Sequence, residues 1–157
     1  MKDRDPRELL LSFKARCLVH FAVDTEEVWM TTKLNGINTY FLPFNKGNNG
    51  GKGNPVGNST YRTSYLWEEV LQKDSLLDIV QRFIHLQEDK KNPKKSVMIF
   101  PRYHQLDVVR KLVADVYANG TGHNYLIQHS AGSGKSNSIS WLAHHLSNLH
   151  DKNDKVV

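Results

Sequence analysis

A short glycine-containing segment constrains the fold of this 157-residue chain more than any other part of the sequence. The segment Gln128 to Ser136 reads QHSAGSGKS. An apolar run, Tyr125 to Ile127, precedes it, and we expect that run to be a short buried strand. A helical pattern follows, formed by the apolar residues Ile139, Leu142, Leu146 and Leu149. Strand, glycine loop, Lys-Ser and helix is the order found in mononucleotide-binding cradles.

The residue types in this segment suit the binding of phosphate. Gly132 and Gly134 lack a Cβ, so the backbone can curl with its N–H groups turned toward an anion, at the positive end of the helix dipole. Lys135 would reach the β- and γ-phosphates of a nucleotide, and the Ser136 hydroxyl would bind Mg²⁺. The predicted ATP-binding residues of the loop are Ser130, Ala131, Gly132, Ser133, Gly134, Lys135 and Ser136.

The loop departs from the full pattern at one position. His129 stands where a Gly, or in many helicase-type motors an Ala, is expected. We interpret His129 as a residue that packs within the loop rather than as a base or ligand. The alternative for the whole segment is a Gly/Ser-rich turn that only joins a strand to a helix.

Composition limits the class of protein. The chain is 39% hydrophobic and 24% charged, and it has no apolar run near the roughly 18 residues of a membrane helix. The lack of such a run predicts no membrane partner. The one cysteine, Cys17, lies in an apolar run and allows no internal disulfide, which predicts a cytoplasmic protein. The net charge of +5 permits a polyanionic partner. The basic run Lys90 to Lys95 contributes to that charge, although such runs are usually just solvated.

The first part of the chain predicts β structure. Residues 17–23 are apolar, residues 24–27 form a turn, and residues 28–34 alternate between two faces. An Asn35-Gly36 turn then leads to a third apolar run, residues 40–42. These features predict a small antiparallel meander.

Residues 45–60 are rich in Gly and Asn and predict a long mobile loop or linker. Two helices should follow, one capped by Ser64 and one opened by Ser75. A polar connector and a short apolar segment, residues 96–100, come next. A helix starting at Pro101 should bury Leu106, Val109, Leu112, Val113 and Val116. It should end at Asn119-Gly120, before the phosphate loop. The tail Lys155 to Val157 resembles the first residues of another strand, which predicts a parallel βαβ unit that is incomplete.

Several segments resemble one family in order along nearly the whole chain. They are Asp3 to Arg7, Phe13 to Asp24, Phe41 to Gly47, Tyr65 to Glu68 and His129 to Ser136. Together they look like the restriction subunit of type I restriction–modification enzymes, an ATP-dependent DNA translocase and endonuclease. The resemblance implies an α/β fold in which the meander with its helices joins the incomplete beginning of a RecA-like P-loop domain with a parallel sheet.

The resemblance also implies a domain plan. Residues 1–44 would be the C-terminal part of a nuclease-like region, 45–63 a Gly/Asn-rich linker, 64–95 connecting helices, and 96–157 the start of the motor domain. The implied cofactors are ATP and Mg²⁺. The implied partners are double-stranded DNA and the methyltransferase and specificity subunits of the same system.

One further site residue follows from the resemblance. Gln105 lies about 30 residues before Lys135, where related motors carry a glutamine that reads adenine, and a carboxamide can pair with adenine N6 and N7. The alternative is a solvent-facing residue in the first turn of a helix.

No catalytic constellation is complete in the sequence. The family's nuclease carboxylates would lie before Met1, and its second ATPase motif after Val157. Glu88-Asp89-Lys90 has a nuclease-like spacing but follows a helix, so we interpret it as a solvated connector. The fragment alone is therefore expected to be inactive. The competing hypotheses are a non-catalytic nucleotide-binding or docking module from a truncated gene and, less well supported, a small P-loop kinase.

Overall fold

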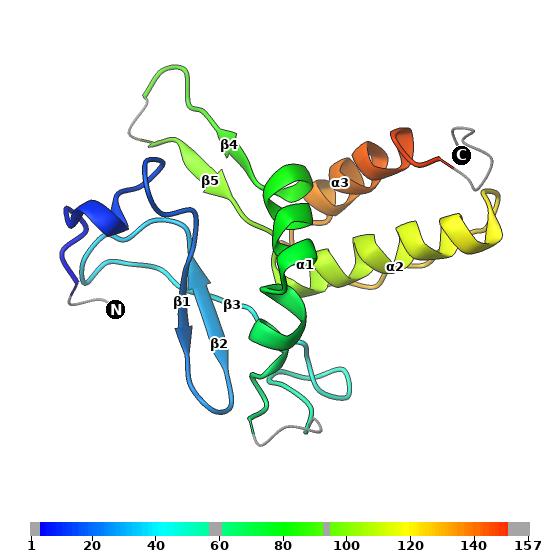
Figure 1. Cartoon of the computed structure of the whole chain (residues 1–157), viewed down its shortest axis with the longest axis horizontal. Coiled ribbons are helices and arrows are strands. Elements are labelled where there is room, and N and C mark those ends of the chain that lie inside the picture. Colours follow the sequence, from blue (N-terminus) through cyan, green and yellow to red (C-terminus); the bar gives the residue numbers. More distant parts are fainter. Residues whose placement is uncertain (1–3, 57–60, 93–94, 151–157) are drawn as a thin grey trace. The chain divides into compact units, whose positions relative to one another are not determined.

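A computed structural model describes residues 4–56, 61–92 and 95–150 of the chain (Figure 1). The chain forms two compact units, unit 1 (Met1–Arg102) and unit 2 (Tyr103–Val157). Unit 1 holds both β-sheets, and unit 2 holds a pair of helices that pack on each other.

The predicted antiparallel meander is present in unit 1, after a short 3₁₀ turn, η1 (Leu9–Leu11). Strand β1 (His20–Val23) pairs with β2 (Val28–Thr31), and β2 pairs with β3 (Leu42–Pro43). Both pairings are antiparallel, as the alternating pattern predicts. The meander is therefore confirmed, although its third strand is shorter and begins later than the apolar run at 40–42.

Alternation in β2 places apolar side chains in the core. Val28, Met30 and, beyond the strand, Leu34 are buried, while Trp29 is partly exposed. Thr31 breaks the alternation because it is also buried, and its hydroxyl donates a hydrogen bond to the Lys33 carbonyl at 3.1 Å. That bond offsets the cost of burying a polar group.

The two turns of the meander form where their sequences predict them. The Asp24 carboxylate accepts hydrogen bonds from the backbone N–H groups of Glu26 and Glu27, both at 2.8 Å. At the second turn Gly36 has φ +53°, and the Asn38 N–H donates to the Asn35 carbonyl. A short polar side chain at the first turn and a glycine at the second thus allow the chain to reverse direction.

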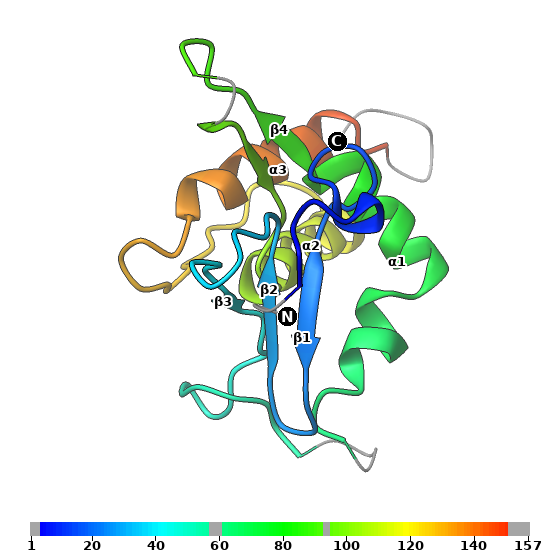
Figure 2. The same ribbon diagram turned by 90° about the vertical axis from the view of Figure 1, so that its left-hand side faces the viewer.

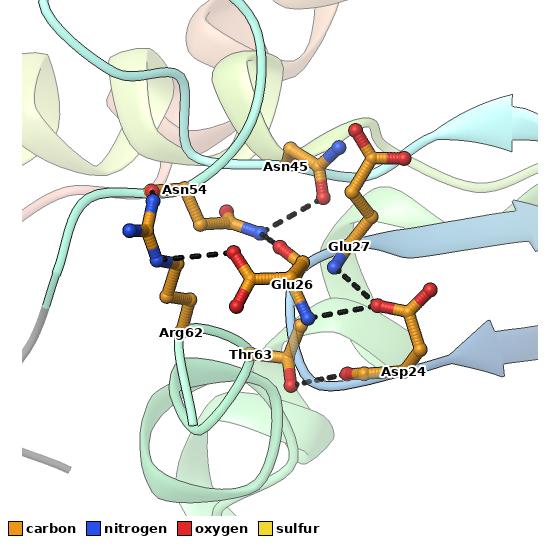
Figure 3. Close-up of polar contacts among 7 residues, drawn as sticks. All are labelled: Asp24, Glu26, Glu27, Asn45, Asn54, Arg62 and Thr63. Atoms are coloured by element: carbon orange, nitrogen blue, oxygen red, sulfur yellow. Dashed lines mark hydrogen bonds and ion pairs between the residues drawn. The ribbon is translucent and has the colours of Figure 1, made fainter. Parts of the chain in front are cut away.

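The Gly/Asn-rich segment holds no helix or strand within its described part, residues 45–56. It does have an internal frame that its composition did not predict, shown in Figure 3. Asn54 is 2% exposed, and its amide donates to the Glu26 carbonyl at 2.8 Å and to Asn45 Oδ1 at 3.0 Å. Asn45 Oδ1 also accepts from the Val28 N–H, so this loop is tied to the start of β2.

The helical part of unit 1 differs from the expected pair of capped helices. It consists of a π-helical segment, η2 (Leu66–Val70), the helix α1 (Lys73–Asp78) and a π-helical continuation, η3 (Ile79–Phe83). Ser64 is not a side-chain cap, because the N–H groups of Trp67 and Glu68 donate to its backbone carbonyl and not to its hydroxyl. Ser75 lies inside α1, and its hydroxyl donates to the Val70 carbonyl at 2.8 Å.

A second sheet completes unit 1. Strand β4 (His85–Gln87) pairs antiparallel with β5 (Val97–Ile99), so the apolar segment at 96–100 is a hairpin strand. Phe100 follows β5 and packs edge-on against Phe21 of β1, with ring centroids 5.8 Å apart. Phe44 is fully buried and joins the same cluster. These rings anchor the hairpin in the core of the unit.

Unit 2 contains α2 (Tyr103–Asn119) and α3 (Lys135–Ser147). The predicted stripe of α2 is confirmed at Leu106, Val109, Leu112 and Val116, which are all buried, while Val113 is partly exposed. The helix ends as predicted, because Gly120 adopts φ +80° and donates its N–H to the Val116 carbonyl.

Helix α3 buries a face one position away from the apolar pattern. Its buried residues are Ser138, Trp141 and His145, whereas Ile139 is 67% exposed. The large Trp141 ring determines the inward side, because it offers more apolar area than any neighbouring side chain.

The strand predicted at Tyr125 to Ile127 is wrong for the structure as described. These residues form no β-bridge, and Leu126 is 95% exposed. A strand requires a partner for its backbone N–H and C=O groups, and unit 2 offers no strand among its described residues 103–150. The other predicted strand, at Lys155 to Val157, lies outside the described residues.

The fold is thus mixed α/β, with a three-stranded antiparallel sheet, a two-stranded sheet and helices. The described residues contain no parallel sheet of the RecA type. They also contain no helix that is both long and apolar enough to cross a membrane.

Candidate phosphate-binding loop

The backbone of residues 128–136 curls through two glycines. Gly132 has φ +70° and Gly134 has φ +82°, both in the left-handed region that side chains disfavour. Between them, the Ser133 N–H donates to the Ser130 carbonyl at 3.3 Å. Gly134 is the N-cap of α3, so the predicted passage from loop to helix at Lys135 is confirmed.

Several backbone donors of the loop remain unused. The N–H groups of Gly132, Gly134, Lys135 and Ser136 have no hydrogen-bond partner within the described residues. The last two belong to the first turn of α3, a 13-residue helix whose dipole places partial positive charge at this end. Unpaired N–H groups at a helix N-terminus are the donors that anions bind in proteins.

Lys135 supplies a full positive charge at the same place. Its ammonium donates to the carbonyls of His129 at 3.1 Å and Ser130 at 3.0 Å. The side chain is exposed, and no described carboxylate forms an ion pair with it. The lysine therefore spans the loop while its charge remains uncompensated.

Helix α2 of the same unit supports the loop from the other side. Gln105 is 3% exposed, and its side-chain amide donates to the carbonyls of Ser133 at 3.2 Å and Gly134 at 2.9 Å. A Cβ built on Gly134 would lie 2.4 Å from Gln105 Nε2. The solvent-facing interpretation of Gln105 is therefore wrong, and position 134 requires glycine for both its φ and its space.

Two histidines complete the contact. His104 Nε2 lies 3.2 Å from the Ser133 carbonyl, and the His104 ring stands edge-on to His129, with centroids 4.8 Å apart. His129 thus packs within the loop region, as its position in the motif suggested. His104 was not among the predicted site residues, and its place beside Gln105 at the start of a helix was the available signal.

The remaining predicted residues differ in accessibility. Ser130, Ala131, Gly132 and Ser136 are exposed, whereas Ser133 is 5% exposed and its hydroxyl has no partner in the described structure. An accessible Ser136 hydroxyl in the first turn of α3 suits a cation bound through a nucleotide. Ser133 acts through its backbone, with its side chain turned inward.

No carboxylate accompanies the loop among the described residues. The two described acids of unit 2 are Asp107 and Asp115, both on α2. Asp107 pairs with Lys111 at 2.7 Å, and Asp115 accepts from Tyr125 at 2.5 Å and from Asn119 at 2.8 Å. Within the described ranges no three His, Cys, Asp or Glu residues gather as metal ligands.

Comparison with known proteins gives no assignment. No family model, no curated protein and no solved structure matches the chain.

Proposed function

We propose that the chain contributes the ATP phosphate-binding loop of an ATP-dependent, DNA-translocating endonuclease subunit of a type I restriction system. The proposal joins the ordered sequence resemblance to the chemistry of the loop. Its partners would be duplex DNA and the methyltransferase and specificity subunits. The proposal includes a RecA-like parallel sheet, which the described residues do not contain.

One observation carries the proposal. Four unpaired N–H groups, a helix N-terminus and an uncompensated lysine lie together at residues 132–136. Every helix leaves its first N–H groups without an intrahelical partner, and here two glycine N–H groups and the Lys135 ammonium stand beside them. The phosphate oxygens of a nucleoside triphosphate would accept hydrogen bonds from these N–H groups.

The residues present fit ATP and Mg²⁺. The loop N–H groups and Lys135 would bind the phosphates, and Ser136 would bind the cation, which neutralises charge on the phosphate oxygens. Gln105 would read adenine only if its amide released the loop carbonyls that it now binds. In the observed arrangement, Gln105 fixes the conformation of Ser133 and Gly134.

The second candidate is a module that binds nucleotide without turnover. The observation that favours it is the position of the two described acids of unit 2, both of which are bonded away from the loop. Phosphoryl transfer needs an acidic group to hold Mg²⁺ and orient water. Sustained phosphate release from purified chain with Mg²⁺ and ATP, abolished by Lys135→Ala, would exclude this candidate.

Nucleotide binding by the chain tests the phosphate loop directly. Calorimetry with Mg²⁺ and a non-hydrolysable ATP analogue should show binding that Lys135→Ala weakens at least tenfold, since a charge-assisted hydrogen bond contributes about 1.5–3 kcal/mol. Lys111→Ala is the matched control, because it removes an exposed lysine from the same unit. Equal binding by Lys135→Ala and the parent protein would overturn the proposal.

The role of Gln105 is tested separately. If it reads adenine, Gln105→Ala should narrow the preference for ATP over GTP by about 1–3 kcal/mol. If Gln105 only holds the loop, Gln105→Ala should weaken the binding of ATP and the binding of GTP by the same factor. The ratio of the two affinities separates the two roles, and unchanged affinity for both nucleotides excludes both.

A further inference from the structure

The loop end of the β4–β5 hairpin in unit 1 carries a group of lysines that the phosphate loop does not involve. Lys90, Lys91 and Lys95, named here the lysine tip, are all exposed. In both views the hairpin end projects beyond the other elements of its unit (Figures 1 and 2). Pro93 and Lys94 lie outside the described residues, and the inference does not use them.

The base of the hairpin is fixed in the core. Met98 and Phe100 are 8% and 6% exposed, and Phe100 packs against Phe21 and Phe44. The register between strands is regular, with His85 opposite Ile99 and Gln87 opposite Val97. The lysine tip therefore stands on a supported two-stranded ribbon.

Hydrogen bonds also fix the backbone of the tip. Asp89 Oδ1 accepts from the N–H groups of Lys91 and Asn92, both at 2.9 Å, and the Lys95 N–H donates to the Asn92 carbonyl at 2.8 Å. The Asp89 carboxylate is thus engaged by backbone N–H groups, while the neighbouring Glu88 side chain is exposed. No ion pair joins either carboxylate to any member of the lysine tip within the described structure.

Ion pairs elsewhere in unit 1 involve several of its other basic side chains. The described ion pairs of the unit join Arg4 to Glu8, Arg7 to Asp5, Lys46 to Glu69, Arg62 to Glu26 and Arg82 to Asp78. The three lysines of the tip have no such partner among the described residues. Their charges are free to meet an external anion.

We propose that the lysine tip contacts the phosphate backbone of duplex DNA. The exposed part of the tip offers no aromatic or large aliphatic side chain between Glu88 and Lys95, so it lacks the anchors of protein interfaces and the stacking platforms of single-strand binding. A two-stranded ribbon fits the major groove of B-DNA, where lysines reach phosphates on either side. Phosphate contacts are independent of base sequence.

This inference names the DNA-contacting surface within the proposed function and so rests on it, but its test uses a separate measurement. A random-sequence duplex labelled with a fluorophore is titrated with the full chain over a range of NaCl concentrations. Each lysine that neutralises a phosphate adds about 0.9 to the slope of log K against log[salt]. A triple variant Lys90→Gln, Lys91→Gln, Lys95→Gln should lower the slope by about 2–3 and weaken binding at every salt concentration.

The matched control removes the same charge from other exposed positions of unit 1. It combines Arg16→Gln, Lys52→Gln and Lys73→Gln, all exposed in the structure. Equal effects of the two triple variants, or no effect of the tip variant, would overturn the inference. Tighter binding to a single strand or to polyglutamate than to the duplex would also overturn it.

Nucleotide binding distinguishes failure of this inference from failure of the proposed function. The tip variant should bind the ATP analogue as the parent chain does, whereas Lys135→Ala should weaken binding of the analogue. Circular dichroism of each variant checks the fold, which exposed substitutions should leave intact.

Discussion

Two glycine-containing loops of this chain, residues 45–56 and 128–136, differ in their hydrogen bonds and in the structure that follows them. In the first, the Gly47 N–H donates to the Gly53 carbonyl at 2.9 Å, and Asn48 and Gly51 exchange two backbone bonds. In the second, the N–H groups of Gly132, Gly134, Lys135 and Ser136 have no partner within the described residues. The first loop pairs part of its backbone internally, whereas the unpaired N–H groups of the second include those at the start of a helix.

Lys46 of the first loop and Lys135 of the second differ in their charge partners. Lys46 forms a 2.6 Å ion pair with Glu69 and lies over the Tyr65 ring, 5.1 Å from its centroid. Lys135 meets only carbonyl oxygens, from His129 and Ser130. An internal carboxylate therefore neutralises Lys46, whereas Lys135 has no ion-pair partner among the described residues.

The comparison shows that flanking structure, not glycine content, decides what a loop can bind. The side-chain amides of Asn45 and Asn54 hold the first loop to the meander (Figure 3). They bond to backbone groups of Val28, Lys46 and Glu26. The second leads into α3, and the first turn of a helix leaves its N–H groups unpaired by geometry. The second arrangement suits the anion binding proposed above, and the first does not.

Replacement of Gly134 by alanine should give the largest effect on this contrast. The new Cβ would meet Gln105 Nε2 at 2.4 Å, and φ +82° adds strain of about 1–2 kcal/mol. We expect binding of the ATP analogue to be lost, as measured by calorimetry. Gly53→Ala is the control, since it has φ +87° but nothing within 4 Å of its Cβ, and it should leave nucleotide binding unchanged. Parent-like binding by Gly134→Ala would show that the loop does not need its observed shape.

An intermediate effect is expected from the first loop. Asn54→Ala removes the acceptor of the Lys46 N–H and the donor to the Glu26 carbonyl, both at 2.8 Å. Leaving buried partners unsatisfied should lower the free energy of unfolding by about 1–3 kcal/mol, measured by urea denaturation. Asn48→Ala in the same loop should cost less, because the described contacts of Asn48 are backbone ones. Equal costs for the two variants would mean that the Asn54 network does not hold the loop.

Local patterns predicted much of unit 1 and the helices of unit 2. The alternation at Val28 and Met30 predicts β2, and the stripe from Leu106 to Val116 predicts α2, because each pattern matches the period of the element that forms. The Gly132–Gly134 spacing likewise predicts the curl of the phosphate loop. These features depend on residues that are close to one another in the sequence.

Features that depend on distant partners were not predictable. Tyr125 to Ile127 has a strand-like composition, but no described strand pairs with it. The Asn45–Asn54 frame joins positions that composition alone marks as linker, and the Gln105 amide reaches Ser133 across 28 positions of sequence. Side-chain-to-backbone bonds of this kind leave no periodic signal, so only the structure reveals them.

The smallest predicted effect concerns the entrance to the phosphate loop. Whereas a buried amide closes the first loop, an exposed hydrogen bond from the Tyr125 hydroxyl to Asp115 holds the chain just before the second loop. Hydrogen bonds from Tyr125 and then Asn119 hold the Asp115 pKa below its ordinary value of 3.8, and the bond to Asp115 raises the Tyr125 pKa above 10.0. Because the folded-state pKa of Asp115 is lowered, its stabilising contribution is present above pH 3.8 and is lost as pH falls through the folded-state pKa. The Tyr125 contribution is present below pH 10.0 and is lost at higher pH.

Tyr125→Phe should therefore move the Asp115 pKa upward, toward its ordinary value, in an NMR titration of the carboxyl group. Tyr117 is an exposed tyrosine on α2, the helix that carries Asp115. Tyr117→Phe should leave the Asp115 pKa unchanged. Since the bond is exposed to solvent, the loss of stability should be smaller than for Asn54→Ala. An Asp115 pKa that does not respond to Tyr125→Phe would mean that the entrance to the second loop is not tied to α2, and the contrast between the two loops would then be greater than the structure indicates.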